Sequence, residues 1–257
     1  MKLENKVAVI TGAGSGMGRE SALLFSKEGA KVCVVDIDSK NGEQTVDLIK
    51  QTGREAIFAQ ADVSDAGDAE KMISTTVDTF GKLDILFNNA GIAMAMTPVE
   101  EVKEDVFSRI MDINVKGIFL GCKYAVPIMK KQGGGVIINT ASVSGVRARP
   151  GLSAYTASKG AAILLTKGLA IELAPHKIRV NCLNPVAADT PMLPKFIDDS
   201  GAKDKKYEDA RQRFIDTIPL GRLATAGDVA AAALFLASDE ASLITGVALE
   251  VDGGRAI

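Results

Sequence analysis

The sequence predicts an α/β protein built on a doubly wound parallel β-sheet. Short runs rich in valine and isoleucine alternate with helix-like stretches along the whole 257-residue chain. The runs are continuously apolar, which is typical of strands that helices cover on both faces. Right-handed crossover connections then place helices on both sides of one sheet.

Seven strands are expected, at 7–11, 31–36, 56–60, 83–88, 136–141, 178–184 and 248–251. Helices are expected near 17–28, 39–52, 65–80, 103–131, 154–174 and 226–237. No linker, repeat or low-complexity segment interrupts the alternation. We therefore expect a single domain over residues 1–257.

The longest break in the pattern is the polar segment 187–222, which contains Pro191, Pro194 and Pro219. Loops of this length are usually lids or disordered segments. This one follows the carboxyl end of the sixth strand, where doubly wound sheets bind ligands, and it carries apolar residues such as Met192. A substrate-binding lid is the favoured interpretation, and disorder is the alternative.

Composition narrows the class of protein. The formal net charge is −2, so no basic face indicates a nucleic-acid partner. No apolar run approaches the roughly 20 residues of a membrane helix, so no membrane partner is expected. The cysteines Cys33, Cys122 and Cys182 stand singly, which indicates buried free thiols and a cytoplasmic protein. His176 is the one histidine, so no histidine-based metal site is expected.

Tyr155 and Lys159 lie four residues apart on the helix expected at 154–174, so both side chains leave the same face. A phenol titrates near pH ~10. A cation ~4 Å away, at an effective dielectric of about 20, is worth roughly 4 kcal/mol and would lower that pKa by about 3 units. The spacing suits a tyrosine that acts as general acid and base, although any helix can carry such a pair by chance.

A glycine-rich turn joins the first strand to the first helix. Gly12, Gly16 and Gly18, with Ser15 and Met17 among them, follow the spacing Gly-x-x-x-Gly-x-Gly. Glycines at this place permit a tight turn and let the backbone approach a pyrophosphate at the helix N-terminus. The turn therefore predicts a dinucleotide site.

Asp36 ends the second strand, 18 residues beyond Gly18. A carboxylate there accepts hydrogen bonds from a ribose 2′-hydroxyl and repels a 2′-phosphate. This favours NAD over NADP as the cofactor. An ordinary aspartate in a turn is the alternative interpretation.

Three motifs occur together and in order. They are Thr11-Gly12-x-x-x-Gly16-x-Gly18, Asn88-Asn89-Ala90-Gly91 and Tyr155-x-x-x-Lys159. With them the chain resembles the short-chain dehydrogenase/reductase family over essentially its whole length. The resemblance implies a Rossmann-type fold, NAD(H) as cofactor, and a homotetramer packed through the helices near 103–131 and 154–174.

The resemblance also assigns further cofactor contacts. Asp62 and Val63 match the adenine-binding pair, although Asp-Val-Ser-Asp also suits the start of a helix. Asn89, Ala90 and Gly91 match the turn that touches the cofactor ribose, although such turns are common anywhere.

After the sixth strand, the resemblance places Pro185, Ala188 and Thr190 beside the nicotinamide. Val186 departs from the family pattern, which has a glycine there that lets the backbone lie close to the nicotinamide.

The resemblance completes the catalytic set. Asn114 is assigned to hold a water beside Lys159 in a proton relay. Ser142 follows the fifth strand, and its hydroxyl would hydrogen-bond the substrate oxygen while Tyr155 exchanges the proton. Ser144 is the competing serine, but the family pattern favours Ser142.

Residues expected to border the substrate are Ser142, Met94, Arg147, Arg149 and Met192. The two arginines either bind an acidic group of the substrate or are solvated surface charges.

The sequence thus predicts an NAD-dependent oxidoreductase that interconverts a small-molecule secondary alcohol and a ketone. The enzymatic alternative is a 3-oxoacyl reductase acting on carrier-protein or coenzyme A thioesters. Such reductases usually take NADPH and favour a basic residue where this chain has Ser15. A non-catalytic NAD-binding module is the alternative from another class.

Overall fold

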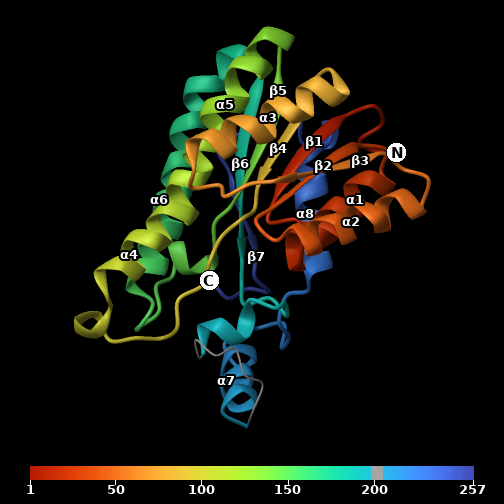
Figure 1. Ribbon diagram of the computed structural model, residues 1–257. Helices are drawn as coiled ribbons and strands as arrows, with labels where there is room; N and C mark the ends of the chain where they lie inside the picture. Colours follow the sequence, from red (N-terminus) through yellow and green to blue (C-terminus); the bar gives the residue numbers. More distant parts are fainter. Residues whose placement is uncertain (198–204) are drawn as a thin grey trace.

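The computed structural model describes residues 1–197 and 205–257, so part of the predicted lid, 198–204, lies outside the described residues. One sheet of seven parallel strands, in the order β3-β2-β1-β4-β5-β6-β7, runs through the molecule (Figure 1). The strands are β1 Val7–Thr11, β2 Lys31–Asp36, β3 Ala56–Gln60, β4 Ile85–Asn88, β5 Gly135–Thr140, β6 Ile178–Pro185 and β7 Ala248–Val251. The predicted fold class is confirmed.

Helices cover both faces of the sheet. They are α1 Gly16–Lys27, α2 Ser39–Gln51, α3 Ala66–Phe80, α4 Glu104–Met111, α5 Gly117–Gln132, α6 Ser153–Leu173, α7 Lys205–Ile215 and α8 Ala226–Ala237. Side chains of α1, α2 and α8 form one apolar core with the sheet, and those of α3, α5 and α6 form the other. Because each strand supplies residues to both cores, its sequence is apolar without alternation.

The helix predicted at 103–131 is divided. Residues Asp112–Lys116 form a short π-helix between α4 and α5. A single π turn between two α-helices changes the spacing of apolar residues very little. The sequence pattern therefore predicted one continuous helix. The single wider turn matters because it carries Asn114, which is fully buried.

The segment predicted as an irregular lid contains more regular structure than expected. A 3₁₀ turn, Leu193–Phe196, is followed by helix α7, which lies beyond the end of the sheet (Figure 1). Tyr207 and Phe214, seven residues apart on α7, are both buried in a small apolar cluster with Leu193.

All seven strands run in the same direction, so their carboxyl ends meet at one edge of the sheet. The glycine turn after β1, the turn after β4, the Ser142 loop after β5 and the segment after β6 all lie there. Doubly wound sheets place ligands at this edge.

The three cysteines are free and buried, as predicted. His176 lies exposed in a 3₁₀ turn. In the described ranges, no helix is long and apolar enough to cross a membrane.

Candidate active site

Two adjoining hollows open at the carboxyl edge of the sheet. The larger cleft encloses about 930 Å³ and runs along the β1–α1 turn, the end of β2 and the β4 turn. The narrower pocket encloses about 80 Å³ and contains Ser142, Tyr155 and Lys159. Met17, Gly91 and Thr190 border both, so the narrow pocket opens from the large cleft.

The glycine turn brings two segments of backbone into contact. Gly12 has φ +64°, and a Cβ built on it would lie 2.9 Å from the Cα of Ala90. A Cβ on Gly18 would lie 2.2 Å from the carbonyl oxygen of Gly12. Such separations are closer than real Cβ contacts, so only glycine allows α1 to start this near β1.

The first turn of α1 faces the larger cleft without a side-chain cap. Ser15 is the N-cap residue, its backbone is extended, and its side chain makes no capping hydrogen bond. Ser15 and Gly16 both line the cleft. Uncapped backbone N–H groups at a helix N-terminus suit a phosphate, so the residues present fit the pyrophosphate of a dinucleotide.

Thr11 ties the turn after β4 to the glycine turn. Its Oγ1 accepts hydrogen bonds from the backbone N–H groups of Asn89 and Ala90, both at 3.0 Å. The Asn89 side chain in turn donates to the carbonyl oxygen of Thr11 at 3.0 Å. Asn88 donates to the Asn139 side chain at 2.9 Å, which links β4 to β5.

Asp36 lies at the far end of the larger cleft. Its carboxylate accepts the N–H of Gly14 at 2.8 Å and that of Asp38 at 3.0 Å. The acid is therefore fixed beside the glycine turn.

Asp62 and Val63 also line the larger cleft. The Ser64 hydroxyl and N–H both donate to Oδ1 of Asp62, and the hydroxyl is the main reason that the pKa of Asp62 is lowered. Asp65, rather than Asp62, caps α3. Both readings of Asp-Val-Ser-Asp therefore hold in part: one aspartate begins the helix and the other faces the cleft.

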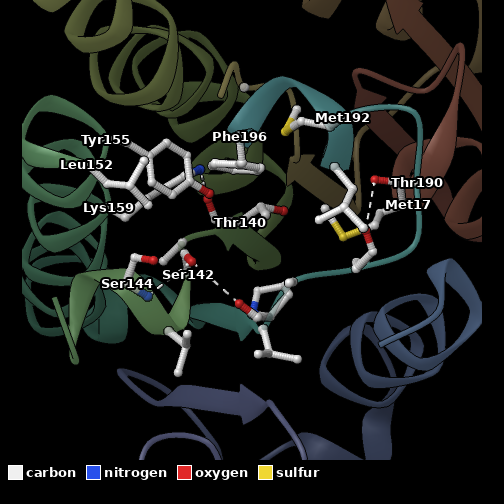
Figure 2. Close-up of a pocket in the computed structure, with 18 of the residues that line it drawn as sticks. Met17, Thr140, Ser142, Ser144, Leu152, Tyr155, Lys159, Thr190, Met192 and Phe196 are labelled. Carbon is white, nitrogen blue, oxygen red and sulfur yellow. Dashed lines mark hydrogen bonds between the residues drawn. The ribbon is translucent and has the colours of Figure 1, made fainter. Parts of the chain in front are cut away.

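Ser142, Tyr155 and Lys159 converge on the narrow pocket, as Figure 2 shows. The Tyr155 hydroxyl is hydrogen-bonded to the Ser142 side chain. Lys159 Nζ donates to the carbonyl oxygen of Thr140 at 2.8 Å and lies 5.6 Å from the centre of the Tyr155 ring. The predicted acid/base pair and its serine thus come together from α6 and the end of β5.

Ser142 and Ser144 occupy different places. The Ser142 hydroxyl accepts the N–H of Ser144 at 3.1 Å and donates to the Pro185 carbonyl at 3.4 Å. The contact with the Tyr155 hydroxyl belongs to Ser142.

The charge state of Tyr155 differs from the expectation. Burial raises the pKa of Tyr155 to about 12, although the Ser142 hydrogen bond lowers it, and burial lowers the pKa of Lys159 to about 8. Desolvation disfavours the charged form of each group. The helical spacing indicated proximity but not burial, so the predicted lowering of the Tyr155 pKa is wrong for the protein in this state.

Asn114 clamps the backbone beside the pocket. Its Oδ1 accepts the Ile92 N–H at 2.8 Å, and its Nδ2 donates to the Ile92 carbonyl at 3.1 Å and to Ser158 Oγ at 3.1 Å. A Cβ built on Gly91 would lie 3.1 Å from Asn114 Oδ1 and 3.5 Å from Lys159 Nζ, so the two side chains flank this glycine. The Asn114 amide is thereby engaged with protein groups.

The end of β6 and the residues after it line the narrow pocket. Pro185, Ala188 and Thr190 line the narrow pocket, and the Thr190 hydroxyl donates to the Ala188 carbonyl at 3.4 Å. Val186 also lines it and packs in the apolar cluster that includes α7. The side chain that departs from the family pattern therefore contributes apolar surface to the pocket.

The predicted substrate residues divide into two groups. Met192 and Arg149 line the narrow pocket with Ser142. Met94 is buried against Tyr155 in an apolar cluster behind the pocket, and Arg147 donates to the backbone oxygens of Arg255 and Ile257. The pocket lining therefore includes neither Met94 nor Arg147 among the described residues.

Thr140, Leu152 and Phe214 are among the pocket residues that were not predicted, whereas Phe196 is an apolar residue of the predicted lid. The carbonyl oxygen of Thr140 accepts a hydrogen bond from Lys159, and Leu152 and Phe214 add apolar surface. Phe196 meets Tyr155 edge-on with ring centres 5.0 Å apart (Figure 2). Thr140 adjoins the motif serine in sequence and Phe196 falls in the predicted lid, but nothing local in the sequence indicates Phe214.

Comparisons with known proteins agree with this geometry. The family model described as Enoyl-(Acyl carrier protein) reductase matches residues 12–256. An uncharacterized oxidoreductase of Thermotoga maritima is 43% identical over 99% of this chain and 98% of its own. The 4-formylbenzenesulfonate dehydrogenase TsaC1/TsaC2 of Comamonas testosteroni is 40% identical over the full length of both chains.

Two further relatives have informative chemistry. The crystal structure of 3-ketoacyl-(acyl-carrier-protein) reductase from Brucella melitensis, complexed with NADH, is 45% identical with a TM-score of 0.91. It covers 99% of this chain and 100% of that one. Cyclohexanol dehydrogenase of Acinetobacter sp. (strain SE19) is 37% identical over 98% of this chain and 95% of its own. With these matches over nearly its whole length, the chain belongs to the short-chain dehydrogenase/reductase family of oxidoreductases.

Proposed function

We propose that this protein is an NAD(H)-dependent oxidoreductase that interconverts a secondary alcohol and a ketone. The observation that carries the proposal is the meeting of Ser142, Tyr155 and Lys159 in a pocket that opens from a cleft suited to a dinucleotide. Relatives that act on a cyclic alcohol or carry NADH in their crystal structure support the same reaction class.

The larger cleft would hold the cofactor along its length. The first turn of α1 would bind the pyrophosphate, Asp36 the adenosine ribose, and Asp62 with Val63 the adenine. Asn89, Ala90 and Gly91 would contact the second ribose, and Thr190 the carboxamide of the nicotinamide. When bound, this group supplies the hydride acceptor or donor.

The narrow pocket would perform the proton chemistry. In oxidation, the Tyr155 oxygen takes the proton of the substrate hydroxyl, and Ser142 holds the same oxygen by a hydrogen bond. Lys159 would bind the ribose hydroxyls beneath Tyr155. Asn114 fixes the Ile92 backbone next to Lys159, and a water held there would complete the path for the proton.

The segment 187–222 would act as the substrate-binding lid of a single domain. Leu193 and Phe196 from its 3₁₀ turn and Phe214 from α7 contribute apolar surface to the pocket, which supports this role. An apolar cover would exclude water from the reacting atoms.

Self-association through α5 and α6 would give the homotetramer that is common in the family. Phe119 on α5 and Leu164 and Ile171 on α6 are exposed, the last two by 70% and 80%. Exposed apolar side chains on neighbouring helices are typical of an interface between protein chains.

A panel of secondary alcohols with NAD, and of the matching ketones with NADH, tests the function. We expect Tyr155→Phe to lower turnover by about 10²- to 10⁴-fold while NADH still binds, because the proton transfer is lost. Tyr124→Phe, on a half-buried tyrosine of α5, is the matched control and should retain full activity. Substantial turnover by Tyr155→Phe would exclude the assigned role.

The second candidate is reduction of 3-oxoacyl thioesters, which the similarity to a 3-ketoacyl-(acyl-carrier-protein) reductase favours. Acetoacetyl-coenzyme A, offered with NADH and with NADPH, belongs in the same panel. Efficient reduction of this thioester, with poor activity on simple ketones, would select this candidate. The relatives reported above are oxidoreductases, and they give no support to the non-catalytic alternative.

A further inference from the structure

The narrow pocket combines an apolar lining with one accessible cation. Its apolar side chains include Ile92, Val143, Leu152, Val186, Leu193 and Phe196. Of the described residues that line it, only Lys159 and Arg149 carry charge, and none is acidic. Lys159 is only 3% exposed and donates to Thr140 behind Tyr155. Arg149, which is half-buried, is therefore the more accessible of the two cations that line the pocket.

Arg149 is held in a fixed orientation by groups from the α7 region. Its guanidinium lies 4.5 Å from the centre of the Phe214 ring, and its Nη2 donates to Thr217 Oγ1 at 2.9 Å. That hydrogen bond uses one of the five N–H donors of a guanidinium. A planar cation stacked on an aromatic ring keeps its remaining donors available for a bidentate partner.

The surroundings of Arg149 are positive. It is half-buried, and burial, followed by the charges of Arg255 and Arg147, lowers its pKa. Asp252, the acid of this cluster, accepts the N–H groups of Gly254 and Ala256. In the part of the chain that the structure describes, no carboxylate pairs with Arg149.

A half-buried cation beside two others is unfavourable unless an anion joins it. A solvated surface arginine would instead extend into water, away from other cations. Here the side chain is stacked, hydrogen-bonded and directed to a pocket wall. This arrangement would stabilise a negative charge that came from outside the chain.

We propose that Arg149 binds an acidic group of the substrate, a carboxylate or a sulfonate, at the end remote from the hydroxyl that Tyr155 deprotonates. The inference rests on the proposed oxidoreductase function and names its substrate class. The apolar lining holds the body of the substrate, and Arg149 selects against molecules that lack the oxyanion.

Matched ketones test the proposal. We would compare 4-acetylbenzoate and 4-acetylbenzenesulfonate with 4-acetylbenzamide, which resembles the carboxylate in shape but is neutral, by kcat/KM with NADH. A charge-assisted contact predicts a preference of about 10- to 100-fold for at least one acid over the amide. The two acids distinguish a carboxylate site from a sulfonate site.

The variants locate the preference. Arg149→Gln should reduce the acid-to-amide ratio to about 1, and Arg149→Lys should keep part of it, since a point charge remains. Arg213→Gln, on an exposed arginine next to Phe214, is the matched control and should keep the wild-type ratio. Thermal melting of each variant establishes that it is folded.

Three results would overturn the proposal: equal use of acid and amide by the wild type, a ratio that Arg149→Gln leaves unchanged, or a preference that only Arg147→Gln removes. If no ketone is reduced although NADH binds, the proposed function fails separately. Calorimetric titration of benzoate, benzenesulfonate and benzamide into the NADH complex then decides. Anion binding that Arg149→Gln abolishes would support the arginine site, and absence of such binding would refute it.

Discussion

Burial favours the neutral form of Tyr155, and the hydrogen bond of Ser142 opposes that effect. Its ring meets Phe196, its hydroxyl bonds Ser142, and burial raises its pKa to about 12. Burial also lowers the pKa of Lys159 to about 8. Both shifts arise because a charge in this pocket loses hydration that the protein does not replace. Reduction uses the protonated phenol form of Tyr155, which donates its proton to the substrate oxygen. Oxidation uses the deprotonated form, which accepts the proton of the substrate hydroxyl.

The rate of alcohol oxidation should therefore rise with pH, because the deprotonated form of Tyr155 increases as pH approaches a raised pKa. The reverse reduction, which uses the phenol, should not rise. Ser142→Ala should move the rising limb to higher pH, since the Ser142 hydrogen bond lowers the pKa of Tyr155, and should lower kcat by about 10²-fold.

Initial rates in both directions, from about pH 6 to about pH 10, would measure these profiles. Ser144→Ala serves as the neighbouring control. If the rate of oxidation rises at the same pH in the wild type and in Ser142→Ala, this hydrogen bond does not determine the pKa of Tyr155.

Asp36 gives the second prediction at this scale. A 2′-phosphate ~5 Å from its carboxylate, at an effective dielectric of ~20, would meet about 3 kcal/mol of repulsion per unit charge. Asp36→Ala should therefore reduce the ratio of kcat/KM with NADH to that with NADPH by about 10- to 100-fold.

Asp38→Asn is the matched control, because Asp38 caps α2 and is not among the described residues that line the cleft. It should leave the cofactor ratio as in the wild type. An unchanged ratio in Asp36→Ala would mean that other groups select the cofactor.

At the scale of elements, the contact between α1 and the β1 turn is the tightest joint near the site. A Cβ on Gly18 would meet both the Gly12 carbonyl and, at 2.6 Å, Nδ2 of Asn89. Gly18→Ala should lower the free energy of unfolding by about 1–3 kcal/mol and weaken NADH binding, because the helix must move away from the turn.

Gly227→Ala near the start of α8 is the control, since its Cβ would meet only Thr225 Oγ1, at an ordinary contact distance of 3.6 Å. There alanine should stabilise the protein by about 0.5–1 kcal/mol through helix propensity. Urea denaturation followed by circular dichroism would compare the two variants. Equal stability of Gly18→Ala and wild type would contradict the close approach.

Most elements could be predicted because they are local. β1, β2 and β3 begin and end at the predicted residues, and α8 follows its expected bounds. The π-helix at Asn114 could not be predicted, because its buried Asn114 side chain bonds the backbone of Ile92, a contact that local sequence does not indicate. Helix α7 was not predicted, because the prolines and the glycine that precede it indicated a loop, although Tyr207 and Phe214 have helical spacing.

In the candidate site too, features set by local sequence could be predicted, and features set by distant contacts could not. Motif residues at strand ends could be placed from the sequence, since parallel strands bring their carboxyl ends together. Contacts between distant segments, such as Arg149 with Phe214, could not. The charge of Tyr155 was misjudged for a related reason, because burial depends on the lid and on α6 together.

At the scale of the whole molecule, the exposed face of α5 and α6 should determine the oligomeric state. Leu164→Glu combined with Ile171→Glu should convert the proposed tetramer to smaller species, because charges in an apolar interface lose hydration. Light scattering after size exclusion would measure the mass. Leu243→Glu, on an exposed leucine between α8 and β7, is the control. An unchanged mass in the double variant would place any interface elsewhere.

The edge-on contact between Phe196 and Tyr155 has an optical consequence. The chain has no tryptophan, so Phe196→Trp would make an indole the only one in the protein, placed against the reacting phenol. The emission of the indole overlaps the absorption of reduced nicotinamide. Energy transfer between them would then report the distance from the 3₁₀ turn Leu193–Phe196 to the cofactor. The emission of this single indole would thus report closure of the pocket, because the protein contains no other tryptophan.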